Sequence, residues 1–116
     1  CIPRSQGMMI GYIMDNQGQN IFQKDIEAEF HLSGATVTNM LKSLEKKGYI
    51  VRTPMENDAR LKRIELTQKA LDHENRVREN IRVIEEAMHK GFSKEEFDMM
   101  LGFLDRVIDN MEELNM

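Results

Sequence analysis

"TVTNMLKSLEKKGYIVR", residues 36–52, holds most of a helix, the end of that helix and the start of a strand. Its apolar side chains recur at i, i+3, i+4 and i+7, the spacing of one buried helix face; they are Val37, Met40, Leu41 and Leu44. Ser33 is a favourable N-cap, and Gly48 can take the left-handed conformation that ends a helix. We therefore predict a helix from Ser33 to Lys47, followed by a strand over residues 49–53.

The opposite face of this predicted helix carries methyl, hydroxyl, amide and ammonium groups, and no acid before Glu45. Such short or cationic side chains can approach base edges and phosphates in the major groove of DNA. The residues concerned are Ala35, Thr36, Thr38, Asn39, Lys42, Ser43 and Lys46. The same groups are also ordinary on a solvated helix, so this face alone does not decide between the two interpretations.

The flanking segments favour DNA binding. Residues 23–30 place Ile26 and Phe30 four apart, and a tight turn leads from this short helix to Ser33, which predicts a helix-turn-helix. A further helix over Arg4–Asp15 is indicated by Met9, Tyr12 and Ile13.

Residues 54–60 have turn chemistry, and Lys62–Leu66 alternates apolar with charged residues, so a two-stranded wing follows the helix-turn-helix. The wing carries four cations that can meet phosphates; they are Arg52, Arg60, Lys62 and Arg63. A basic wing beside a polar helix face is typical of DNA-binding proteins.

Two long helices are predicted for the rest of the chain. The first begins after Thr67 and ends near residues 89–91; its apolar positions are Ala70, Val77, Ile81, Ile84 and Met88. The second opens with a capping box, Ser93 and Glu96, and its stripe comprises Phe97, Met100, Leu101, Leu104, Ile108 and Met111. One small domain cannot cover both stripes, so we expect a second subunit to cover them.

Composition agrees with one domain of 116 residues with a net charge of −4. The charge is segregated: residues 1–32 carry −2, residues 33–67 carry +3, and residues 68–116 carry −5. We predict a mainly α fold with a small two-stranded β wing. Residues 1–67 would form the winged helix-turn-helix DNA-binding region, and residues 68–116 a helical dimerisation region.

The single cysteine, Cys1, cannot form an internal disulfide, and no apolar run approaches the roughly 18 residues of a membrane span. We therefore expect a cytoplasmic protein. Because the sequence begins with Cys and shows no signal-peptide pattern, we expect it to be a fragment of a longer chain.

The stretch "LSGATVTNMLKSLEKKGYIVR" followed by "DARLKRIELT" resembles the recognition helix and wing of the MarR family of winged-helix transcription regulators. The family's wing typically reads Asp-x-Arg and then Leu-Thr where the next helix begins. Here these positions are Asp58, Arg60, Leu66 and Thr67. The resemblance runs from about Gln6 to the C-terminus.

The resemblance implies a homodimer on double-stranded DNA. Each recognition helix would enter the major groove, Arg60 would reach the adjacent minor groove, and Asp58 would hold the wing's basic groups by a salt bridge. Two-fold symmetry implies a pseudo-palindromic site with half-sites about 34 to 36 Å apart. We expect a repressor that a small amphipathic or phenolic effector releases. Met8, Met9 and Met14 are candidate lining of an effector pocket, although methionines are more often simply core residues.

This chain departs from the family pattern in several places. Almost all of the family's N-terminal helix, which joins the dimer interface, is absent before Cys1. Phe22 stands where a Ser or Thr cap is common, His31 where Gly often ends the helix, and Asn39 where a larger basic residue is frequent. The first two indicate local repacking, and Asn39 bears on sequence preference.

Two other functions remain open. The winged helix could serve protein interaction, with its acidic helices on a partner chain, or it could belong to a metal or redox sensor. For a sensor, His73 and Glu74 offer two ligands and Cys1 a thiol, but no metal-site spacing is present. No nucleophile, phosphate loop or paired carboxylates suggest an enzyme, because acidic pairs such as Glu85 and Glu86 are expected on solvated helix faces.

Overall fold

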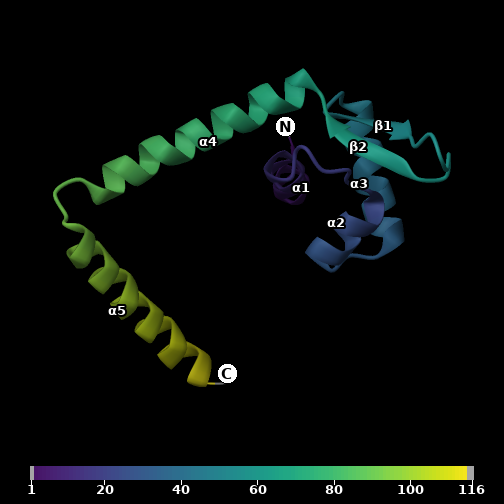
Figure 1. The fold of residues 1–116 in the computed structure, drawn as a ribbon. Coiled ribbons are helices and arrows are strands. Elements are labelled where there is room, and N and C mark those ends of the chain that lie inside the picture. Colours follow the sequence, from purple (N-terminus) through teal and green to yellow (C-terminus); the bar gives the residue numbers. More distant parts are fainter. Residues whose placement is uncertain (1, 115–116) are drawn as a thin grey trace. The chain divides into compact units, whose positions relative to one another are not determined.

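The computed structural model describes residues 2–114, which form five helices and one two-stranded sheet (Figure 1). In chain order these are α1 (Arg4–Asp15), α2 (Gln23–Phe30), α3 (Gly34–Lys46), β1 (Ile50–Pro54), β2 (Lys62–Leu66), α4 (Gln68–His89) and α5 (Lys94–Glu113). The predicted mainly α fold with a β wing is confirmed. Two compact units divide the chain; we call them unit one, which ends at Arg78, and unit two, which begins at Glu79.

The helix ends follow from capping residues. Ser33 Oγ accepts a hydrogen bond from the backbone N–H of Thr36 at 3.2 Å, and Gly48, just after α3, has a φ of +84°. At α5, Ser93 Oγ accepts from the Glu96 N–H at 3.1 Å while the Glu96 carboxylate accepts from the Ser93 N–H at 2.8 Å. The predicted caps are therefore confirmed.

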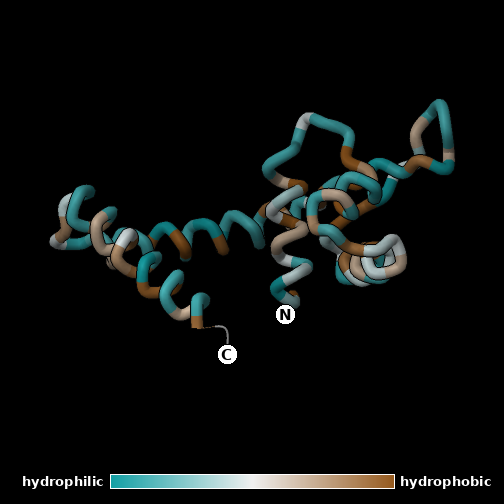
Figure 2. Tube along the Cα trace, turned by 90° about the horizontal axis from the view of Figure 1, so that it is seen from below, coloured by the Kyte–Doolittle hydropathy of each residue, from teal (hydrophilic) through white to brown (hydrophobic). Residues whose placement is uncertain are grey.

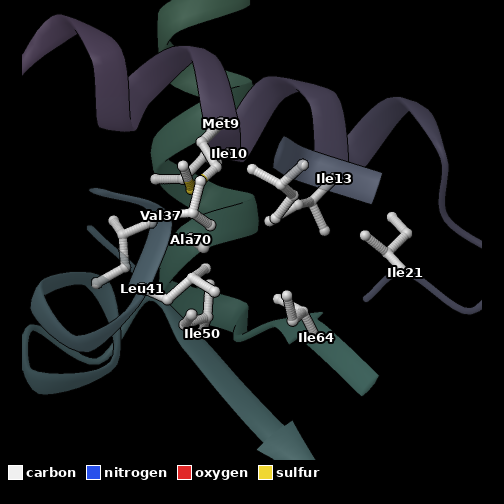
Figure 3. Packing of buried hydrophobic residues seen from close by; sticks show 11 residues of the cluster. Met9, Ile10, Ile13, Ile21, Val37, Leu41, Ile50, Ile64 and Ala70 are labelled. Atoms are coloured by element: carbon white, nitrogen blue, oxygen red, sulfur yellow. The ribbon is translucent and has the colours of Figure 1, made fainter. Parts of the chain in front are cut away.

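A single apolar core holds unit one together (Figure 3). It draws three residues each from α1 and α3, and one each from α2, β1, β2, α4 and the loop before α2. The buried members are Met9, Ile10, Ile13, Ile21, Ile26, Val37, Leu41, Leu44, Ile50, Ile64 and Ala70. Met9 is thus a core residue rather than the wall of an effector pocket, and Met8 beside it is 54% exposed.

The wing is an antiparallel ribbon in which Ile50 pairs with Leu66, Arg52 with Ile64 and Pro54 with Lys62. Ile64 points into the core, and its N–H donates to the carbonyl of Ile21 at 2.8 Å, which ties the ribbon to the segment before α2. The buried side of β2 therefore fixes the wing beside the helix-turn-helix.

Unit two keeps most of its apolar side chains in contact with solvent. Ile84 and Met88 of α4 are 58% and 55% exposed, and Leu104 and Ile108 of α5 are 50% and 53% exposed. Figure 2 shows hydrophobic positions recurring along α5 between hydrophilic ones. Among the described residues of this unit, Phe97 is buried and Met100 is half-buried; the Phe97 ring stacks on His89 at a centroid distance of 3.8 Å.

No helix within residues 2–114 combines the length and apolar character needed to cross a membrane.

Candidate nucleic-acid interface

The two helices of the helix-turn-helix are joined by one amide. Gln23, in the first turn of α2, has its Nε2 3.1 Å from the carbonyl of Gly34, 3.0 Å from Oγ1 of Thr38 and 3.0 Å from Oε2 of Glu27. Below this bridge Ile26 is fully buried in the core. The bridge and the core contact together hold α3 in a fixed orientation on α2.

The ends of α2 show how the chain accommodates two unusual residues. Phe22 has no side-chain oxygen to cap the helix. Instead its backbone N–H donates to the carboxylate of Asp25, three residues later, at 2.8 Å, and this hydrogen bond stabilises the start of α2. His31 takes the left-handed conformation with φ of 54°, and Leu32 N–H bonds to the Glu27 carbonyl. The turn therefore forms without glycine.

The face of α3 opposite the core is open to solvent. The exposed members of the predicted DNA-binding set on this helix are Ala35, Thr36, Asn39, Lys42 and Lys46. Thr38 and Ser43 are half-buried at its edges, and the Thr38 hydroxyl already accepts from Gln23. Ser33 Oγ donates to the Thr36 hydroxyl at 2.9 Å. Both threonines keep a hydroxyl proton to donate outward.

The wing tip presents one arginine in a fixed position. The Arg60 side chain is 91% exposed, and its Nε lies 3.2 Å from Oδ1 of Asp58. The same carboxylate oxygen accepts from the Arg60 backbone N–H at 3.0 Å. These hydrogen bonds from Arg60 lower the pKa of Asp58. The expected ion pair within the wing is thus present, and it leaves most of the guanidinium free to meet another molecule.

Two of the other three wing cations, Arg52 and Arg63, form ion pairs. Arg52 is only 19% exposed, and its Nη2 lies 3.0 Å from Oε1 of Glu45, near the end of α3. The hydrogen bond from Arg52 lowers the pKa of Glu45. Arg63 pairs with Glu65 at 2.7 Å, whereas Lys62 is exposed. Arg52 therefore connects β1 to α3 in this structure, a role that the sequence did not reveal because the two residues share no local pattern.

The wing and the helix-turn-helix border a common hollow of about 550 Å³ in unit one. Arg52, Arg60 and Lys62 line it from the wing side, and Phe22 and Lys24 from the α2 side. Asp25 and Glu27 also line the α2 side, and α3 reaches the hollow only through Leu41, so the exposed face of α3 lies outside it.

His73 and Glu74, the described members of the predicted sensor set, contact other residues rather than a common site. The Glu74 carboxylate pairs with Arg78, while the His73 ring packs edge-on against Tyr49 at 5.7 Å. Across residues 2–114 no three His, Cys, Asp or Glu side chains are grouped closely enough to hold a metal ion. Cys1 lies outside the described residues.

A protein-family model described as the MarR family matches residues 2–61, which are 60 of the 116 residues. Among curated proteins, the chain is 30% identical over 105 residues to the HTH-type transcriptional regulator SarZ of Staphylococcus haemolyticus, covering 89% of this chain and 67% of that one. It is 39% identical over 70 residues to SarZ of Staphylococcus epidermidis, covering 56% and 46%. That second match spans about half the length of the relative.

Solved structures of MepR from S. aureus are similar along nearly the whole chain. A MepR–DNA complex superposes with a TM-score of 0.80 at 28% identity, covering 95% of this chain and 82% of that one. MepR bound to ethidium bromide gives a TM-score of 0.80 at 28% identity, with 95% and 79% covered.

Proposed function

The chain belongs to the MarR family of winged-helix transcription regulators, and from this premise we propose that it is a homodimeric, sequence-specific DNA-binding repressor released by a small effector. The observation that carries the proposal is the pair of exposed features that unit one presents. They are an α3 face without acids before Glu45 and an arginine that is 91% exposed at the wing tip.

The α3 face and the wing tip would read DNA differently. The exposed α3 side chains are short enough for close approach, and Asn39 can pair with two edge atoms of adenine in the major groove. Arg60, held by Asp58, would enter the neighbouring minor groove, where its charge would contribute to affinity on most sequences. The likeness to a MepR–DNA complex supports DNA binding by a chain of this fold.

The homodimer is supported by the exposed apolar stripe of unit two. Leu101, Leu104, Ile108 and Met111 of α5 are each at least 45% exposed. A contiguous stripe of this kind on a water-soluble helix marks an interaction surface, and a two-fold contact would present two α3 helices to a pseudo-palindromic site. We also propose that the protein is cytoplasmic, because a transcription regulator acts in the compartment that holds its DNA.

We infer the chemical class of the effector from a protein of similar structure. MepR has been solved with ethidium bromide, a flat amphipathic cation, and this chain shares its fold. We therefore propose an amphipathic aromatic effector for this protein. The relatives with known roles are transcription regulators rather than enzymes.

Fluorescence-anisotropy titration on random duplex DNA and on sites enriched from a random library, at two salt concentrations, tests the DNA-binding surface. Arg60→Ala should weaken binding to every sequence and reduce the slope of log affinity against log salt by about one. Arg76→Ala removes the same charge from an exposed position of α4, and it should change neither quantity.

Asn39→Ala should behave differently from Arg60→Ala. It should cost about 1–3 kcal/mol on the enriched site and little on random DNA, because an amide pair to a base is sequence-specific. Equal losses on both DNAs would contradict base readout by Asn39. Weak binding without any enriched site, from a protein shown to be dimeric, would instead favour the second candidate, a winged-helix module for protein interaction.

A further inference from the structure

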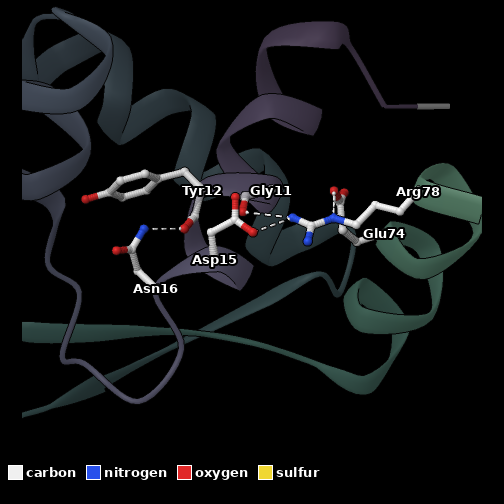
Figure 4. A network of polar contacts seen from close by, with 6 residues as sticks. All are labelled: Gly11, Tyr12, Asp15, Asn16, Glu74 and Arg78. Carbon is white, nitrogen blue, oxygen red and sulfur yellow. Dashed lines mark hydrogen bonds and ion pairs between the residues drawn. The ribbon is translucent and has the colours of Figure 1, made fainter. Parts of the chain in front are cut away.

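Three charged side chains join α1 to α4 near the end of unit one: Asp15, Glu74 and Arg78, which we call the Arg78 triad (Figure 4). Nη2 of Arg78 lies 2.8 Å from Oδ1 of Asp15 and 3.4 Å from the carbonyl oxygen of Gly11, and Nε lies 3.0 Å from Oε1 of Glu74. One planar guanidinium therefore contacts the backbone and a side chain of α1 and a side chain of its own helix.

The two helices approach closely at this point. A Cβ on Gly11 would lie 3.3 Å from Oε1 of Glu74, closer than an ordinary van der Waals contact, so glycine permits the approach. The Glu74 side chain is only 11% exposed, and Arg78 provides the cation that its buried carboxylate requires. Among the ion pairs of residues 2–114, that between Arg78 and Asp15 is the one that joins α4 to another helix.

The triad lies at a point of α4 where a small change of helix direction displaces the end of the helix. Arg78 is the last residue of unit one, and α4 continues from it to His89. At 1.5 Å per residue this remaining segment is about 16 Å long, so a tilt of about 10° at Arg78 moves its end by about 3 Å. That displacement is close to the rise of about 3.4 Å between successive base pairs.

We propose that Arg78, through Asp15 and Glu74, is a positioning residue that sets the distance between half-sites that this regulator accepts. The proposal rests on the proposed function, in which unit two forms the dimer and α3 reads DNA. None of the three triad residues belongs to the proposed DNA-binding surface. The effect of the triad is on spacing: a firm α1–α4 contact makes the dimer accept one separation of half-sites, and a loosened contact makes it accept several.

Asp15→Asn is the sharpest variant, because it weakens the contact between helices and leaves the buried Glu74 paired with Arg78. Arg78→Lys is the second; it keeps the charge but loses the rigid fork that reaches Asp15 and Glu74 together. Matched controls lie just after Arg78 on α4. Glu79→Gln and Arg82→Lys change two ion pairs whose partners, Glu79, Arg82 and Glu86, all belong to that helix.

Parallel selections from a random-sequence duplex library give the half-site and its spacing for each protein. Anisotropy titrations then compare the selected half-sites at the best spacer and at one base pair more and less. We expect wild type and both controls to prefer the best spacer about tenfold, within the usual range of coupling between sites. Asp15→Asn and Arg78→Lys should select the same half-site but prefer one spacer by about threefold or less.

An unchanged spacer preference in both triad variants would overturn the proposal. So would equal losses of affinity at every spacer together with a lowered melting temperature, because that result assigns the triad a purely structural role. Absence of any paired half-sites in the wild-type selection would instead refute the proposed function itself, and the spacing proposal with it.

Discussion

Replacing Gln23 by alanine should destabilise unit one by about 1–2 kcal/mol, because this side chain is the polar bridge between α2 and α3. Three acceptors lie within 3.1 Å of Nε2, but the amide has two N–H groups, so two bonds are made at a time. Each such bond contributes about 0.5–1.5 kcal/mol net. The residue is only half-buried, which favours the lower half of the resulting range.

Thermal unfolding followed by circular dichroism at 222 nm measures the effect. For a unit of this size the loss corresponds to a fall in melting temperature of about 5–10 °C. Gln19→Ala is the control, since Gln19 is exposed in the loop before α2. It should leave the melting temperature nearly unchanged, as expected for a surface substitution.

A double-mutant cycle with Thr38→Val tests whether the bridge is the cause. Thr38 accepts one of the Gln23 bonds at 3.0 Å, so the two substitutions remove a shared interaction. Their effects should fall short of additivity by about 0.5–1 kcal/mol. Additive effects, or a Gln23→Ala melting temperature equal to that of Gln19→Ala, would refute the bridge.

Two further predictions concern the core and the wing. Ile10→Ala should cost about 2–5 kcal/mol in urea unfolding, because Ile10 is fully buried, whereas Met8→Ala on the exposed side of α1 should stay within about 0.5 kcal/mol; similar losses would place Ile10 outside the core. Since Arg52 lowers the pKa of Glu45 in the folded chain, their pair stabilises the fold above the unfolded pKa, and the contribution is lost as pH falls through the folded pKa. Glu45→Gln should therefore flatten the decline of unfolding free energy between about pH 5 and pH 3, and an unaltered pH dependence would count against the pair.

Much of the fold could be predicted because its signals are local. Ser33, Gly48 and the Ser93–Glu96 pair act on backbone groups within one helical turn, so sequence neighbours alone determine where α3 and α5 begin or end. The strands were equally readable, since Ile64 and its alternating neighbours show which side of β2 is buried. Ile10 was overlooked, although it lies beside Met9 on the same buried face of α1.

The candidate site was less accessible to sequence reasoning, because contacts between distant residues decide which polar groups remain free. The sequence does not distinguish Arg52 from Arg60. In the structure Arg52 pairs with Glu45 and its side chain is 19% exposed, whereas the side chain of Arg60 is 91% exposed. Asp15 and Arg78 are 63 positions apart, and neither residue belongs to a pattern that points to the other. Such pairs depend on how helices pack, which the periodicity of one helix does not specify.

The exposure of unit two connects folding with the proposed function. Helices of this length gain little stability in water by themselves, and burial of an apolar face supplies most of it. In the described chain Leu104, Ile108 and Met111 are each at least 50% exposed, and covering a Leu, Ile or Met side chain contributes about 1.5–3 kcal/mol. In the proposed homodimer a second copy supplies that cover, so dilution below the dimer dissociation constant should loosen α5 and separate the two α3 helices together. DNA affinity then depends on protein concentration even though no residue of α5 belongs to the proposed DNA surface.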